Sequence, residues 1–318
     1  MRAEQGELVL GGQAVIEGVM MKGPEKFSVA VRKTSGEIRV KDFPIASGPA
    51  KRALSKMPLL RGVVTMAAML VIGYRALQFS ADEAIEDAES EAGGAKKASP
   101  KEEGSGGSGL AMAGALALAL LLGIGLFFWL PLLLTRGIAA LLPSLSGRVA
   151  FNLLDGLIRV LVFVGYVAGI AMMKDIRRIF QYHGAEHKVV HAYESRAELA
   201  PERVAAFPNL HPRCGTSFLL FVMVIGIVVF SFIPHESSLT VKALMRLVLL
   251  PAVAGISYEA LRLTARKAGS PFFKALIAPG LLLQRLTTRE PDLSQIEVAI
   301  ASFRRVVPGK EGEAALVG

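Results

Sequence analysis

The chain has 318 residues, of which 52% are hydrophobic, and its mean hydropathy of +0.47 excludes an ordinary soluble domain. Its formal net charge is +9, and basic residues that flank apolar segments usually lie on the cytoplasmic side of a bilayer. Because these basic residues are scattered and are not interleaved with aromatic residues, the composition also argues against nucleic acid as a partner.

The first 58 residues predict a small β-rich segment. Residues 27–31 and 37–40 alternate between apolar and polar side chains around a turn at residues 34–36, which predicts a hairpin. Glu17 stands in an apolar run beside a glycine. It is either an acid on an edge strand that faces water, or a site residue that another group can approach closely because of the glycine.

Residues 59–92 predict a helix that lies on the membrane surface or re-enters the membrane. Its uncharged core, residues 62–74, is shorter than the about 20 residues that a membrane-spanning helix needs. Acidic residues crowd the stretch 82–91, which is typical of a solvated helix end. Residues 93–109 are rich in glycine, serine and charged residues, and they predict a flexible linker.

Apolar segments within residues 110–285 predict a mainly α fold, a polytopic membrane helix bundle with about four transmembrane helices. The four segments are residues 110–134, 157–173, 217–233 and 243–258. Lysine and arginine concentrate between the second and third of them, so residues 174–216 are expected to form a cytoplasmic His-rich segment. The N-terminal segment and a C-terminal helix and tail at residues 286–318 are then cytoplasmic as well.

The His-rich segment carries three histidines at helical spacing. His183, His187 and His191 stand at i, i+4 and i+8, so a helix presents them on one face. Residues 183–187 have the H-x-x-E-H spacing of inverted zincins. Two imidazoles one turn apart can reach one tetrahedral ion, and the Glu186 carboxylate can deprotonate or orient a metal-bound water.

A second polar cluster, residues 211–216, contains the only cysteine of the chain. We therefore predict a site for zinc or another divalent metal. Its predicted ligands are His183, His187, His211 and Cys214. Four protein ligands would make a closed, structural site, whereas three would leave an open position for water. A third interpretation is that the histidines are side chains at the membrane edge without a metal.

His191 is expected to lie outside the ligand set, because three ligands in a row down one helix cannot all reach one small ion. Glu194, almost one turn beyond His191, is a candidate oxygen ligand. These assignments keep the site to two imidazoles of the helix and the side chains of the second cluster.

Four stretches of the chain resemble the DUF1385 family, the YqhQ-like group of bacterial membrane proteins. They lie at residues 11–24, 182–188, 211–218 and 286–291. The resemblance implies a multi-pass protein of the bacterial inner membrane and a metal-dependent enzyme. It points to the same site residues, which are Glu17, His183, Glu186, His187, His211 and Cys214.

The favoured hypothesis is a zinc-dependent membrane enzyme, a hydrolase acting at the cytoplasmic face. Glu186 would be its general base, and Glu17 a further catalytic or substrate-contacting residue. The alternative is a non-enzymatic scaffold or assembly factor that holds a protein partner within the membrane. A transporter is disfavoured, because Arg159 and Arg246 lie near the starts of the apolar spans and not at their centres. The lipid bilayer is the other expected partner, and the sequence indicates no oligomeric state.

Overall fold

The computed structural model describes residues 11–45, 48, 53–91, 106–212, 214–234, 237–266 and 270–307. The described chain begins with a four-stranded antiparallel sheet in the order β1-β2-β3-β4. The strands are β1 Gly11–Val15, β2 Gly18–Lys22, β3 Lys26–Arg32 and β4 Ile38–Pro44. The predicted hairpin is confirmed, since Arg32 pairs with Ile38 across a turn in which Gly36 has a φ of 88°.

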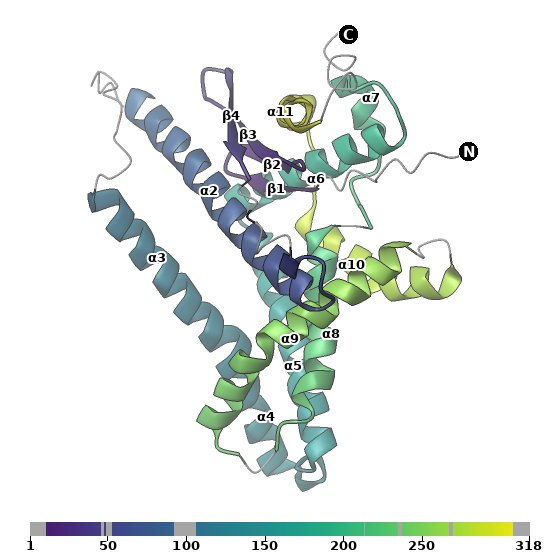
Figure 1. The fold of residues 1–318 in the computed structure, drawn as a ribbon. Coiled ribbons are helices and arrows are strands. Elements are labelled where there is room, and N and C mark those ends of the chain that lie inside the picture. The colour runs from purple at the N-terminus through teal and green to yellow at the C-terminus, as the bar shows by residue number, and fades with distance from the viewer. Residues whose placement is uncertain are drawn as a thin grey trace.

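Helices cover both faces of this sheet (Figure 1). Strand side chains alternate between the faces, so Met20 and Val29 pack with Ile72 of α2, Leu60–Glu91. Val19 and Ala30 belong to a second cluster on the opposite face. This cluster is completed by α6, Lys174–Glu194, and by α11, Leu293–Val306.

The helix α11 begins with a strong start signal. Asp292 accepts a hydrogen bond from the Gln295 backbone N–H, and the Gln295 side chain accepts one from the Asp292 N–H. This reciprocal capping box satisfies two backbone donors that a helix start leaves without partners. It fixes the point at which the chain turns from the bundle back to the sheet.

The remaining helices form a bundle below the sheet (Figure 1). The bundle helices are α3 Gly106–Ile124, α4 Leu130–Leu141, α5 Arg148–Ile170, α8 Gly215–Phe230, α9 Leu239–Arg266 and α10 Pro271–Thr287. The short helix α7, Pro201–Ala205, lies apart from them, beside α6 and α11. A π-helical turn at Gly125–Trp129 joins α3 to α4, and a 3₁₀ turn at Pro143–Leu145 follows α4. Residues 93–105 of the predicted linker lie outside the described residues, and residues 106–109 form the first turn of α3.

The predicted fold class is confirmed, but one of the four predicted membrane-spanning segments is replaced by another helix. Four helices of the described chain are long and apolar enough to cross a membrane: Leu60–Glu91, Ala117–Leu141, Arg148–Ile170 and Thr240–Thr264. The apolar stretch Phe218–Phe230 in α8 is shorter than these. Leucines such as Leu121 and Leu122 are more than half exposed, as expected for side chains that face lipid.

The helix α2 is continuous over 32 residues, although its uncharged core is short. Its first turn is tied to α9, where Arg61 Nε donates to Glu259 at 2.6 Å. Its last turns pair with the sheet, with Lys33 Nζ 3.2 Å from a Glu83 carboxylate oxygen. The helix therefore runs from the bundle to the polar sheet. The surface or re-entrant position of this helix stays a prediction.

Candidate metal centre

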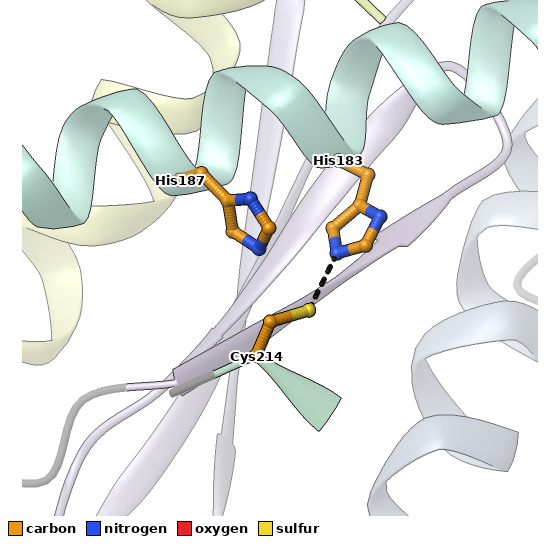
Figure 2. A group of neighbouring side chains, drawn as sticks. All are labelled: His183, His187 and Cys214. Atoms are coloured by element: carbon orange, nitrogen blue, oxygen red, sulfur yellow. Dashed lines mark hydrogen bonds between the residues drawn. The ribbon is translucent and has the colours of Figure 1, made fainter. Parts of the chain in front are cut away.

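One face of α6 and the start of α8 bring two histidines and the cysteine together (Figure 2). Cys214 is the N-cap residue of α8, and its sulfur accepts a hydrogen bond from the Thr216 N–H. His183 Nε2 lies 3.2 Å from Cys214 Sγ, and the rings of His183 and His187 have centroids 4.4 Å apart. One ligand atom from each of the three residues lies within 4.8 Å of the other two. This geometry allows one small cation to contact all three.

Backbone carbonyl groups fix the tautomers of both rings. His183 Nδ1 donates to the Thr287 carbonyl at 2.8 Å, and His187 Nδ1 donates to the Asn209 carbonyl at 2.7 Å. Since a carbonyl only accepts, each Nδ1 carries the proton and each Nε2 keeps its lone pair. Metal-ligating histidines usually donate their other ring N–H in this way.

The buried His187 ring has one nitrogen that could bind a cation. Its Nε2 has no hydrogen-bond partner among the described residues, and burial lowers its pKa, so the ring stays neutral. A buried lone pair without a donor is costly unless something binds it. Two imidazoles and one cysteine sulfur are a donor set that suits zinc, and three protein ligands leave a fourth position open. The residues therefore fit a metal.

The Glu186 side chain lies against strand β1. Its carboxylate accepts a hydrogen bond from the Gly12 backbone, while its Oε2 has no partner among the described residues. A Cβ at Gly12 would lie 2.8 Å from the Glu186 Cδ, so the glycine makes room for the carboxyl. Burial raises the pKa of Glu186, an effect that the nearby His183 opposes.

The structure places His211 in a different group from Cys214. One ligand atom from each of His191, Glu194 and His211 lies within 4.8 Å of the other two. The His211 ring centroid is 4.5 Å from that of His191 and 5.9 Å from that of His187. The four predicted ligands are therefore divided between two neighbouring groups. The i+8 spacing of His191 was the sequence signal for the second group.

Glu17 is held apart from both groups. It occupies the β1–β2 turn with a φ of 52°, and Arg178 binds its carboxylate with two N–H groups, one at 2.6 Å. Tyr182 donates to the same carboxylate at 3.2 Å. A cavity of about 490 Å³ lies beside this pair, between the sheet and α2. The structure thus ties Glu17 to the N-terminal half of α6.

The fold and the site define a mainly helical protein with apolar helices and a polar domain that gathers metal-ligating side chains. The chain belongs to the family described as "Protein of unknown function (DUF1385)", which matches residues 57–309. It is 35% identical over 300 residues to "Uncharacterized protein YqhQ" of Bacillus subtilis (strain 168), covering 93% of this chain and 92% of that protein. No solved structure matches the chain. The predicted family is confirmed, and neither description states an activity.

Proposed function

We propose that the protein is a metal-dependent enzyme of the bacterial inner membrane, a hydrolase whose site faces the cytoplasm. The observation that carries this proposal is the buried His187 Nε2, which has no hydrogen-bond partner among the described residues and lies near His183 and Cys214. Three protein ligands with an open fourth position are typical of catalytic zinc sites. The cytoplasmic side follows from the basic residues between α5 and α8.

In this proposal the chain divides the work among a few side chains. His183, His187 and Cys214 hold zinc or another divalent metal, which when bound lowers the pKa of a coordinated water and polarises a substrate carbonyl or phosphoryl group. Glu186 accepts and returns a proton, for which its raised pKa suits it, as does an Oε2 without a hydrogen-bond partner in the described part of the chain. Glu17 positions α6 through Arg178.

Metal analysis and turnover together test this proposal. Protein purified in detergent should contain one more equivalent of metal than the His183→Ala and Cys214→Ala variants. Glu186→Gln should keep that metal and lose at least about 100-fold in turnover, the usual contribution of a general base. Turnover is measured on a panel of chromogenic esters, phosphodiesters and peptides, with the exposed Glu198→Gln as the control.

Two outcomes would contradict the proposal. If wild-type protein and Cys214→Ala have the same metal content, then the proposed metal centre does not exist. If the Glu186→Gln variant binds metal at the centre and is fully active, then Glu186 is not the general base.

A structural metal in a scaffold protein is the second candidate. The carbonyl groups of Thr287 and Asn209 come from α10 and from the segment before α8, so a bound ion would join three separate parts of the chain. In this case chelation lowers stability, and Glu186→Gln supports growth as well as wild type in a strain that depends on the protein. A growth defect of Glu186→Gln with unchanged metal content would exclude this second candidate.

A further inference from the structure

We infer that His191, Glu194 and His211 form a second divalent-cation site, separate from the His183 centre. One ligand atom from each of the three residues lies within 4.8 Å of the other two, and His211 Nε2 is 3.5 Å from a Glu194 carboxylate oxygen. Two imidazoles and a carboxylate are a donor set that proteins use for zinc and for divalent iron. This inference is independent of the proposed hydrolase function.

The His191 ring also donates to a backbone carbonyl, but through Nε2, whereas His183 and His187 use Nδ1. Its Nε2 donates to the Leu210 carbonyl at 2.9 Å, so its Nδ1 keeps the lone pair. The three histidines of α6 therefore each donate to a backbone carbonyl, and each has one nitrogen left for a cation. This repeated outer contact is the arrangement that orients histidine ligands in metal sites.

The His211 backbone is fixed from the other side by α10. The His211 N–H donates to Gln284 Oε1 at 2.9 Å, and Gln284 Nε2 donates to the His211 carbonyl at 2.8 Å. Gln284 is completely buried, so this clamp is rigid. It fixes the His211 backbone, and the His211 ring centroid lies 4.5 Å from that of His191.

The two groups differ in donor chemistry and in access to solvent. The first contains the thiol and a buried His187, whereas the Glu194 side chain of the second is 34% exposed. A thiolate favours softer cations, and an accessible site with a carboxylate accepts a wider range of divalent cations. We expect the second site to exchange its cation faster than the first.

Cobalt(II) titration of the full chain in detergent, followed by absorption spectroscopy, tests the inference. A thiolate ligand gives an intense sulfur-to-cobalt charge-transfer band, whereas a site of imidazole and carboxylate gives only weak d–d absorption. Wild-type protein should bind two equivalents, of which one produces the charge-transfer band. His191→Gln and Glu194→Gln should each bind one equivalent and keep that band, which also shows that the variants fold.

Matched variants separate the two sites. Glu198→Gln, an exposed carboxylate close in sequence to Glu194, should bind two equivalents. Cys214→Ser should lose the charge-transfer band and keep the d–d absorption that depends on Glu194. The second site is overturned if Glu194→Gln and His191→Gln bind as much cobalt as wild type, or if His191→Gln removes the charge-transfer band. Absence of the charge-transfer band from wild-type protein, with the Glu194-dependent absorption present, would contradict only the proposed function.

Discussion

Lys188 is a buried lysine whose ammonium group holds three segments together. Its side chain is 3% exposed, and its Nζ donates to the carbonyls of Ala205 and Phe207 at 2.7 Å each. It also lies 2.7 Å from a Glu290 carboxylate oxygen. Lys188→Met would leave both carbonyls without their donor, so we expect the free energy of unfolding to fall by about 2–4 kcal/mol. Denaturant titration in detergent measures the change.

A surface lysine provides the comparison for Lys188. Lys26 pairs with Asp42 at 2.7 Å, but its side chain is 42% exposed. Since exposed pairs contribute little, Lys26→Met should cost less than about 1 kcal/mol. Equal losses for the two variants would contradict the role assigned to Lys188.

At the scale of single residues, spacing predicts only part of the site. The pairing of His183 with His187 follows from helical geometry, and the structure brings the two together with Cys214. The division between Cys214 and His211 depends on Gln284, which is 73 residues from His211 in sequence. A contact over that distance leaves no periodic signal, so the sequence could not assign His211 to its neighbours.

The close packing of α6 against the segment after α10 depends on Gly184. A Cβ at this position would lie 2.1 Å from the Arg289 carbonyl oxygen, and the Arg289 N–H donates to the Phe180 carbonyl at 2.9 Å. Gly184→Ala must push these backbones apart and should destabilise the protein by about 3 kcal/mol. At Gly169 in α5, an added Cβ would meet no atom of the described chain within 4 Å beyond its own stretch of helix, so Gly169→Ala should be neutral or stabilising by up to about 1 kcal/mol. Thermal unfolding of both variants checks the prediction.

The helices α5 and α9 are joined by a buried ionic cluster. Asp155 is 2% exposed and lies 2.8 Å from Arg246 and 3.0 Å from Arg159. Asp155→Ala would leave two guanidinium groups unpaired between the helices, so we expect a loss of about 3–5 kcal/mol. Adding Arg246→Met should recover part of that loss, as measured by a double-mutant cycle in detergent.

The surface pair of Arg203 and Glu198 is the control for this cluster. Both side chains are exposed, and their charged atoms are 3.1 Å apart. Arg203→Met should change the free energy of unfolding by less than about 1 kcal/mol. If Asp155→Ala has an equally small effect, then the cluster does not join the two helices.

At the scale of elements, apolar runs and turn residues predicted most of the fold. The β3–β4 hairpin followed from its alternation, and the bundle helices from long uncharged stretches. The bounds of α2 agree with the helix predicted over residues 59–92, but the partners of its charged residues were not predicted: Arg61 binds Glu259, almost 200 positions later, and Glu83 binds Lys33. Asp155 lay outside the predicted span, so the shared carboxylate of Arg159 and Arg246 was missed too.

For the molecule as a whole, we expect metal binding and folding to be linked. A cation held only by the folded chain stabilises it, by about 3 kcal/mol when its concentration is 100 times the Kd. Zinc added to chelator-treated protein should therefore raise the Tm by several degrees. The Cys214→Ala variant should show a smaller rise, because one of the ligands of the first centre is missing. Calorimetry in detergent measures both, and equal rises would argue against a thiolate ligand.

The sheet near the start of the chain is closed by a helix near its end. Residues 11–44 are translated before the described bundle helices, whereas α11 is translated after them. This late helix covers one face of the sheet with Ile296 and Phe303, and Ser302 donates to the Ser28 carbonyl. Thr287, whose carbonyl orients His183, is also made late. The contact that orients His183 can therefore form only after α10 has been translated. A nascent chain interrupted before Thr287 carries His183 without the carbonyl group that orients it.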